Sequence, residues 1–261
     1  MTDPTSDIQI VHFDEIDSTS LEARRMVREG RAGDRPVVIR AATQTGGVGR
    51  FGRQWASPKG GLWCTLIWPV KGELESLLDG LGLRVGLACV QALDTTMRRH
   101  GATATVELKW PNDVLINGRK ALGALVEVIH AEHGAAILIG VGVNANIRSE
   151  ELPEDIRAFA TSVRDEIGAE IDIDAMCDDL IAALGASIRP GPLDREALQS
   201  IRARLHGVGA PCTVSLTAAD RRNGVLRGVN NDGRLELEIN GEIWIAPPGA
   251  ELAHAKARSD A

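Results

Sequence analysis

The sequence predicts an α+β protein with a mixed, mostly antiparallel sheet flanked by helices, followed by a small C-terminal β-barrel. Short apolar strands and amphipathic helices occupy most of the chain before residue 211. The Asn117-Gly118 pair between two apolar runs indicates a tight hairpin, and therefore antiparallel pairing. From residue 211 onward, short apolar runs are separated by Asp-Gly and Asn-Gly pairs, a pattern typical of consecutive hairpins.

The elements expected in residues 1–208, the first of two predicted domains, follow from the spacing of apolar residues. Residues 8–13 alternate in polarity, which predicts a strand. A helix is expected next, with Thr19 as its N-cap and Glu22 as the capping-box partner. Apolar residues at helical spacing predict that 73–99 is mostly helix. Further strands are expected at 36–42, 62–68, 104–109, 113–117, 122–129 and 136–143, and further helices at 174–187 and 194–206.

Residues 209–261 form the second predicted domain, the small β-barrel with a frayed tail. A polar stretch near 148–170 precedes the helices that lead into it. The residues from 253 onward are expected to fray, because chain ends without anchoring contacts are commonly disordered. Barrel strands are expected at 212–217, 223–230, 233–239 and 242–246.

The distribution of charge favours an anionic small ligand and argues against general nucleic-acid binding. The formal net charge is −7, which disfavours a polyanionic partner. Residues 40–120 carry eleven Lys/Arg and six Asp/Glu, a local charge of +5 that leaves −12 for the rest of the chain. Arg50, Arg53 and Lys109 lie among Gly, Trp and Pro residues rather than on a charged helix face. These three cations are therefore candidates for ligand contacts.

Targeting and redox signals favour a cytoplasmic protein without membrane association. No apolar run reaches the ~18 residues that a membrane helix needs. The acidic, polar start of the chain is not typical of a signal peptide. The cysteines are scattered, with no spacing typical of zinc ligands or of a disulfide framework, so reduced thiols and no protein-bound zinc are expected. They are Cys64, Cys89, Cys177 and Cys212.

A glycine-rich loop at residues 45–55 carries two arginines and a tryptophan. Its G-x-G-x-x-G spacing matches a dinucleotide-binding pattern, but Pro58 and a further strand follow where that pattern requires a helix. No Walker A sequence is present. The loop can still present backbone N–H groups to phosphate oxygens, with Arg50 and Arg53 as bidentate donors. The alternative is a flexible hairpin loop whose arginines serve solubility.

A second segment, residues 109–113 with the sequence Lys-Trp-Pro-Asn-Asp, places a lysine at the end of a predicted strand. Pro111 favours an extended conformation of the residue before it. Lys109 held there can stabilise charge that develops during adenylyl transfer. Asn112 and Asp113 can order the turn or help to hold Mg²⁺. The alternative is an ordinary strand end followed by an Asn-Asp turn.

These two segments, with others in order between residues 8 and 253, give the chain a resemblance to the biotin–protein ligases. That family is marked by a Gly-Arg-Gly-Arg-type loop and a Lys-Trp-Pro-Asn-Asp motif. Asp17-Ser18-Thr19 and Gln44 resemble its early polar residues. Residues 120–127 (KALGALVE) and 140–146 (GVGVNAN) resemble two of its later strand motifs. The resemblance implies a catalytic domain like that of class II synthetases and an SH3-like C-terminal barrel.

The resemblance also implies an activity, which is the conversion of biotin and ATP to biotinyl-5′-AMP and transfer of biotin to a lysine of a biotin carboxyl carrier domain. Biotin, ATP and Mg²⁺ are the implied ligands. Lys109 and Arg50 are the implied catalytic residues. The implied binding residues are Ser18, Thr19, Ser20, Gln44, Gly47, Val48, Gly49, Arg50, Arg53, Trp55, Lys109, Asn112, Lys120, Gly123 and Asn144.

Two departures from the family pattern keep alternatives open. Val48 stands where the family's loop has its first arginine, which leaves a biotin-binding or adenylate-binding protein without turnover as one alternative. A lipoate-transferring or octanoate-transferring relative is another. About seven residues precede the first strand, with no helix-turn-helix among them, so a DNA-binding role is not expected. The sequence does not decide whether the chain forms a homodimer.

Overall fold

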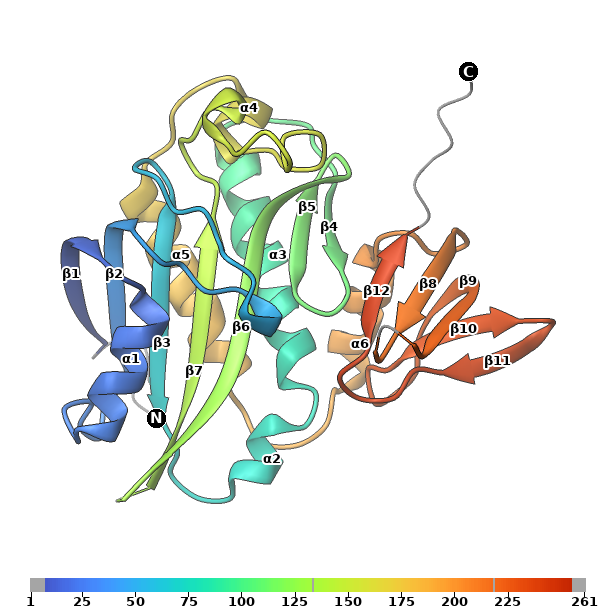
Figure 1. The fold of residues 1–261 in the computed structure, drawn as a ribbon, viewed down its shortest axis with the longest axis horizontal. Helices are drawn as coiled ribbons and strands as arrows, with labels where there is room; N and C mark the ends of the chain where they lie inside the picture. The colour runs from blue at the N-terminus through green and yellow to red at the C-terminus, as the bar shows by residue number, and fades with distance from the viewer. Residues whose placement is uncertain (1–7, 133, 218, 255–261) are drawn as a thin grey trace.

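The computed structural model describes residues 8–132, 134–217 and 219–254, and its largest unit is a seven-stranded sheet (Figure 1). The strand order is β1-β2-β3-β7-β6-β5-β4. The β1/β2 pair is parallel, and each other pair of neighbours is antiparallel, which confirms the predicted mixed sheet. The strands are β1 (Gln9–Ile16), β2 (Val37–Gln44), β3 (Leu62–Pro69), β4 (Val106–Lys109), β5 (Asp113–Ile116), β6 (Arg119–Ala131) and β7 (Gly134–Val143).

Helices cover both faces of this sheet, so its central strands are buried on both sides (Figure 1). Helix α1 (Thr19–Arg28) packs Ala23 and Met26 against Ile39 and Ile67 on one face. On the other face lie α3 (Leu81–Arg99) and α5 (Ile173–Ser187), which pack on each other. The shorter elements are η1 (Arg50–Gly52), α2 (Leu74–Leu78), η2 (Ser149–Glu151), α4 (Val163–Ile167) and α6 (Arg195–Arg204).

Two helix boundaries differ from the predictions. Ser18, not Thr19, is the N-cap of α1, and its hydroxyl accepts from the Leu21 N–H at 3.5 Å. Thr19 is the first residue of the helix, and its hydroxyl accepts from Thr65 and donates to Gln44. Residues 73–99 are mostly helix, as predicted, but the helix is divided into α2 and α3, because Gly80 adopts a left-handed conformation with φ of 69°.

The C-terminal part forms a five-stranded antiparallel sheet in the order β11-β10-β9-β8-β12 (Figure 1). In the described chain β11 and β12 are its two edges, so an open sheet stands where a closed barrel was expected. Strand β12 was missed, since the tail expected from residue 253 begins inside it; the remaining tail, 255–261, lies outside the described residues. The strands are β8 (Pro211–Ser215), β9 (Arg221–Val229), β10 (Leu235–Ile239), β11 (Glu242–Ile245) and β12 (Glu251–His254).

The C-terminal sheet packs directly on the larger part of the molecule. Gly233, in the turn before β10, lies against Leu83 of α3 and Leu193, so closely that a β-carbon there would lie 2.4 Å from Leu83. Its carbonyl accepts a hydrogen bond from the Trp110 indole at 3.1 Å. Apolar residues of both parts belong to one continuous core. The predicted division at residue 208 stays a prediction.

None of the described helices combines the length and the apolar character needed to cross a membrane.

Candidate functional site

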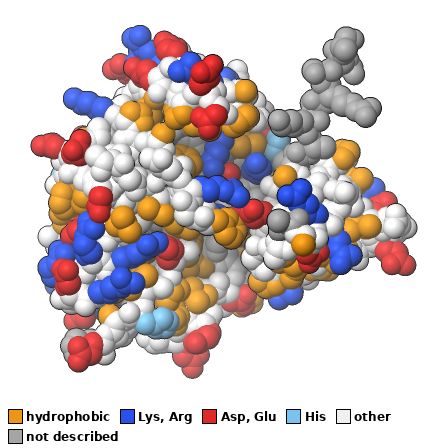
Figure 2. Space-filling view, viewed as in Figure 1, with side chains coloured by type: hydrophobic (Ala, Val, Ile, Leu, Met, Phe, Trp, Pro, Cys, Tyr) orange, Lys and Arg blue, Asp and Glu red, His pale blue; other side chains and the backbone are white. Residues whose placement is uncertain are grey.

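A cavity of about 480 Å³ opens where the larger sheet meets the C-terminal sheet. Figure 2 shows Lys and Arg side chains gathered in this hollow. Its walls come from the start of α1, the glycine-rich loop, the β4–β5 turn, β6, β7, residues 152–160 and β12. Of the predicted site residues all but Gly47 line it: Ser18, Thr19, Ser20, Gln44, Val48, Gly49, Arg50, Arg53, Trp55, Lys109, Asn112, Lys120, Gly123 and Asn144.

The glycine-rich loop is an ordered hairpin, which we call the ligand hairpin and define as residues 47–55. Its two arms are joined by hydrogen bonds from Gly49 N–H to the Arg53 carbonyl at 2.8 Å and from Trp55 N–H to the Gly47 carbonyl at 2.9 Å. A bridge also pairs Val48 with Gln54. Gly47 lies outside the cavity lining, and its role is close packing, because a β-carbon there would lie 2.4 Å from the Trp55 carbonyl oxygen.

Buried hydroxyl and amide groups form a polar network at one end of the cavity. Gln44 Oε1 accepts from the Thr19 N–H at 2.8 Å and from its hydroxyl at 3.1 Å, while Gln44 Nε2 donates to Ser57 at 2.7 Å. Thr65, which was not predicted, donates to Thr19 at 2.9 Å and contacts Ser20 at 3.1 Å. Such a network fixes donors and acceptors in place for a polar ligand group.

The network is held in position by the turn before α1. Asp17 receives two hydrogen bonds of 2.8 Å from Arg25, and one from the Ser18 N–H at 2.7 Å. The hydrogen bond from Arg25 is the main reason that the pKa of Asp17 falls to about 2. The Asp17 carbonyl accepts from Gly46 N–H at 2.8 Å, so the same turn anchors the start of the loop.

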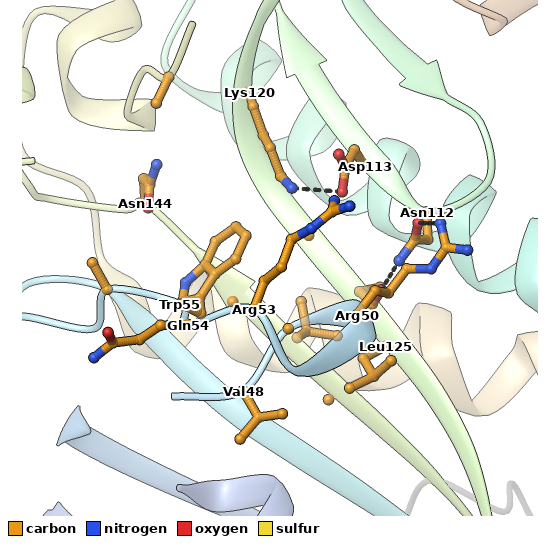
Figure 3. Close-up of a pocket in the computed structure, with 18 of the residues that line it drawn as sticks. Val48, Arg50, Arg53, Gln54, Trp55, Asn112, Asp113, Lys120, Leu125 and Asn144 are labelled. Atoms are coloured by element: carbon orange, nitrogen blue, oxygen red, sulfur yellow. Dashed lines mark hydrogen bonds and ion pairs between the residues drawn. The ribbon is translucent and has the colours of Figure 1, made fainter. Parts of the chain in front are cut away.

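Cations occupy the middle of the cavity. Arg50 makes a long hydrogen bond of 3.5 Å to Asn112 (Figure 3), and burial lowers its guanidinium pKa. Within the described part of the chain, no hydrogen bond or ion pair engages the Lys109 ammonium. The Asn112 side-chain N–H in turn donates a hydrogen bond to the Ala124 carbonyl, which fixes this side chain in place. A negatively charged ligand would find two cations there that form no ion pair with the described carboxylates, although Glu251 and Asp113 act on Arg50 through space.

The Trp55 ring adds a flat apolar surface to the cavity wall. The ring lies against Gly123 and Gly142, where added β-carbons would come within 2.8 Å and 2.7 Å of it. The Lys120 ammonium lies 4.8 Å from the ring centre and 2.7 Å from Asp113 (Figure 3). The buried Trp55 Nε1 has no hydrogen-bond partner among the described residues. An aromatic surface of this kind suits stacking of a planar base.

Asn144 and Asn146, which follow β7 in the GVGVNAN motif, make different contacts. Asn144 lines the cavity, is only 4% exposed, and donates from its side chain to the Thr161 carbonyl at 2.9 Å. It therefore holds the segment that forms one cavity wall. Asn146 lies outside the lining and binds both backbone groups of Ile171, each at 2.9 Å. Of these two asparagines, Asn144 therefore lines the cavity and Asn146 does not.

Several residues of the cavity lining were not predicted from the sequence. Glu251 of β12 lines the cavity and pairs with Arg53 at 2.7 Å. Gly140 and Gly142 of β7 lie in the GVGVNAN motif, where their lack of a side chain was the available signal. Residues 152–160 form an apolar wall of the cavity, but their sequence has no clear hydrophobic periodicity. This wall contributes Leu152, Ile156, Phe159 and Ala160.

Among the described residues no group of three or more His, Cys, Asp or Glu side chains could hold a metal ion. Asp113 and Glu251 are the carboxylates of the lining, and each is already paired with a cation. The four cysteines are free and buried. Burial raises the pKa of Cys89 to about 12 and that of Cys177 to about 11, so these thiols stay protonated at neutral pH.

Several known proteins have sequences similar to that of this chain. Residues 17–144 match the model of the biotin/lipoate A/B protein ligase family. The chain is 32% identical over 234 residues to a biotin–[acetyl-CoA-carboxylase] ligase of Paracoccus denitrificans, which covers 85% of this chain and 90% of that protein. It is 33% identical over 165 residues to the bifunctional ligase/repressor BirA of Bacillus spizizenii, which covers 62% of this chain and about half (48%) of that relative's length.

The fold has a solved counterpart as well. The structure of biotin protein ligase from Aquifex aeolicus in complex with biotin and ATP superposes with a TM-score of 0.79, covering 95% of this chain and 99% of that one. Its sequence identity is 24%, so this likeness concerns the fold. The Paracoccus relative and the family match assign the chain to a family. The protein belongs to the biotin/lipoate A/B protein ligase family.

Proposed function

We propose that this protein is a biotin–[acetyl-CoA-carboxylase] ligase, which activates biotin with ATP and transfers the biotinyl group to a lysine of a biotin carboxyl carrier domain. The observation that carries the proposal is that one cavity joins a fixed polar network, two cations that form no ion pair with a carboxylate of the described chain, and an aromatic surface. These three regions suit the ureido end of biotin, the reacting carboxylate and phosphate, and the adenine base, in that order.

The polar network of Thr19, Gln44 and Ser20 is proposed to bind the polar groups of biotin. The ureido group has both N–H donors and a carbonyl acceptor, so it needs a mixed set of partners. Gln44 and the buried hydroxyls supply such a set, and their mutual hydrogen bonds keep them oriented. Ser18 also lines this end of the cavity. The apolar ring atoms and valeryl chain would then extend toward Lys109.

Lys109 and Arg50 are proposed to act on the reacting groups. In the first step a carboxylate oxygen of biotin bonds to the α-phosphorus of ATP, and the bond to pyrophosphate breaks. Negative charge increases on the phosphate oxygens and the leaving group, and fixed cations stabilise that charge. In the second step the neutral amine of the acceptor lysine attacks the biotinyl carbonyl carbon, and AMP leaves. Neither step requires a covalent bond to the enzyme.

The nucleotide is proposed to lie on the Trp55 side. Gly123 and Gly142 allow the indole to lie against the sheet, and the Lys120 ammonium lies over the ring, 4.8 Å from its centre. This ammonium can interact with phosphate or ribose oxygens. Mg²⁺ is proposed to accompany ATP, because it usually binds substrate phosphates with one or two carboxylates. Asp113 is the lining carboxylate beside Lys120, and it could contribute to that ion.

The proposed function also concerns the C-terminal sheet, the protein partner and the cellular location. The C-terminal sheet is proposed to be an SH3-like domain that begins near residue 209, which its position and five short antiparallel strands support. The carrier domain is the proposed protein partner. A cytoplasmic location is proposed from the use of ATP and from four free cysteines.

Because Val48 replaces an arginine, binding of biotin or its adenylate without turnover is an alternative function. The Val48 side chain lines the cavity and cannot contribute a charge. Val48 pairs with Gln54 in an antiparallel bridge, so its backbone is extended. A β-branched residue readily adopts this conformation. The hairpin itself therefore does not require an arginine at this position. Arg50 and Lys109 remain as cations in the middle of the cavity. For these reasons we favour the active ligase.

The test is biotin-dependent release of pyrophosphate from Mg-ATP, with lipoate and octanoate as control acids. Release with biotin alone is the expected result. Biotin binding without pyrophosphate release would contradict the proposed catalysis and support the binder, and Val48→Arg would then be the first variant to examine. Release with lipoate or octanoate in place of biotin would instead indicate a lipoate-family activity.

A further inference from the structure

The tip of the ligand hairpin has a turn that its sequence does not favour. Arg50 to Arg53 form a two-residue turn closed by a hydrogen bond of 3.1 Å from Arg53 N–H to the Arg50 carbonyl. Its central residues, Phe51 and Gly52, both have positive φ, 57° and 72°. Such type I′ turns favour Asn, Asp or Gly at the first central position. A phenylalanine there is strained, so the turn geometry does not explain its presence.

Core packing does not explain Phe51 either. The residue is 64% exposed, the most exposed large apolar residue of the described chain. Its ring makes cation–π contacts with two guanidinium groups. That of Arg50 lies 4.8 Å and that of Arg53 5.6 Å from the ring centre. Phe51 is not among the residues that line the cavity, whereas both of these arginines are. The ring therefore stands at the rim, outside the space for the small ligands.

The rim is where an acceptor protein must lie. A lysine that enters the cavity to reach the activated carboxyl group is attached to a folded domain too large to follow it. That domain must rest on the surface around the opening, and the tip of the ligand hairpin is part of this surface. Aromatic and arginine side chains dominate the energetics of many protein–protein contacts, and a ring already fixed in place loses little freedom on binding.

We propose that Phe51 is the apolar anchor that binds the carrier domain, with Arg53, whose side chain is 68% exposed, beside it selecting a surface that carries carboxylates. This inference rests on the proposed function. It identifies the contact on the carrier as an apolar patch or pocket bordered by acidic side chains. The carrier lysine would then be presented to the cavity beside the hairpin, on the side where Lys109 and Arg50 lie.

The experiment measures binding apart from turnover. A biotin carrier domain with its acceptor lysine replaced by arginine is titrated into the protein by calorimetry. Phe51→Asn removes the ring and suits the positive φ, so the hairpin is expected to keep its shape. Phe51→Trp retains an aromatic ring. Ile243→Thr is the control, because Ile243 is 55% exposed on the edge strand β11 and does not line the cavity.

The expected result is a dissociation constant raised tenfold or more by Phe51→Asn, and changed less than threefold by Phe51→Trp and by Ile243→Thr. An unchanged constant in Phe51→Asn, or no binding by the wild-type protein, would overturn the inference. The variants are also titrated with biotin. An equal loss of biotin affinity in Phe51→Asn would assign the ring to the ligand site and also overturn it. Failure of the proposed function would appear separately, as absent pyrophosphate release by the wild-type protein.

Discussion

Arg53 in the ligand hairpin and Glu251 at the start of β12 form an ion pair of 2.7 Å across 198 positions of the chain. This contact ties the wall of the cavity to the C-terminal sheet, which contributes Glu251 and Leu252 to the lining. The side chains are 68% and 35% exposed, and exposed pairs contribute only about 0–1 kcal/mol to stability. The role of the pair is therefore to set the position of the hairpin rather than to hold the fold.

Glu251→Gln is expected to leave the unfolding midpoint nearly unchanged while the hairpin opens more often. Biotinyl-5′-AMP would then escape faster, because the hairpin borders the space that it occupies. The measurement is the rate at which the adenylate appears in solution after a single turnover. The double variant Arg53→Glu/Glu251→Arg restores an opposite pair and should restore slow release. Equal release rates in wild type and Glu251→Gln would contradict the proposed role.

Lys109→Ala is expected to lower the rate of adenylate formation about a hundredfold or more, which is typical when one fixed group that stabilises transition-state charge is removed. Folding should be unaffected, since Lys109 is partly exposed and no described residue pairs with its ammonium. Biotin-dependent pyrophosphate release measures the effect. Lys71→Ala is the matched control, because Lys71 is an exposed lysine that does not line the cavity. A rate in Lys109→Ala equal to that of the control would refute the assignment.

Gly142→Ala is expected to weaken ATP binding without unfolding the protein. The φ of Gly142 is not positive, so alanine fits the backbone, but its β-carbon would lie 2.7 Å from Trp55 Nε1. The indole must shift toward the cavity, where it would compete with the base. We expect the KM for ATP to rise about tenfold, equivalent to about 1.4 kcal/mol.

A second-site variant distinguishes this cause from a general disturbance of β7. Trp55→Phe shortens the ring that the new methyl group meets, so the double variant Gly142→Ala/Trp55→Phe should bind ATP better than Gly142→Ala alone. Additive losses in the double variant would show that Trp55 is not the affected group. The KM for biotin serves as the internal control, because the polar network proposed to bind biotin is formed by Thr19, Gln44 and Ser20 and not by the indole ring.

Asp17→Asn tests the turn that anchors both α1 and the loop, through the pH dependence of stability. The pKa of Asp17 is lowered to about 2, so its ionised form is favoured by folding. The resulting stabilisation is present above the unfolded pKa of about 3.9 and is lost as the pH falls through the folded value. Because the carboxylate is 45% exposed, solvent screening limits the effect to about 1 kcal/mol or less.

The measurement is the free energy of unfolding of wild type and Asp17→Asn as a function of pH. The wild type should be the more stable protein above about pH 5, and the difference should shrink toward zero near pH 2. A difference that stays constant across this range would mean that hydrogen bonding, not charge, is responsible. Glu29→Gln is a suitable control, because Glu29 is a more exposed carboxylate whose partner, Arg31, lies on the surface.

The fold could be predicted from the sequence where a local pattern decides the structure. The Asn117-Gly118 hairpin and the strands of the central sheet were confirmed because they depend on turn chemistry and alternation. The division of 73–99 was missed because apolar spacing continues across Gly80, and only its backbone conformation shows the break. Strand β12 was missed because it pairs with β8 far back in the chain, and a four-residue strand has little pattern of its own.

Some residues of the site could be predicted from a local sequence motif, and others could not. Residues that belong to short motifs, such as Gln44 and Lys109, lie in the cavity as the motifs suggested. Thr65 and Glu251 could not be found this way, since their partners Thr19 and Arg53 are brought to them only by the fold. The exposure of Phe51 and its held position also depend on three-dimensional structure, because the sequence Arg-Phe-Gly-Arg does not favour the turn that it forms.

Arg84 offers the sharpest test of stability, because the charge of this buried residue is satisfied by backbone alone. It is 4% exposed and donates five hydrogen bonds, all to carbonyl oxygens, which lie near the end of α2 and after α5. Burial lowers its pKa, but not enough to remove the charge of a guanidinium near neutral pH. Its acceptors are the carbonyls of Leu77, Asp79, Ser187, Arg189 and Gly191.

Arg84→Met keeps much of the apolar volume but leaves these carbonyls without their donor. A buried unsatisfied polar group costs about 1–3 kcal/mol, and the loops after α2 and α5 can relax to reach water, so we expect a total loss of about 3–5 kcal/mol. Urea denaturation followed by circular dichroism measures it. Arg98→Met, in the same helix but with a side chain 69% exposed, should lose less than about 1 kcal/mol. Equal losses in the two variants would mean that Arg84 does not join α2, α3 and α5 as its hydrogen bonds indicate.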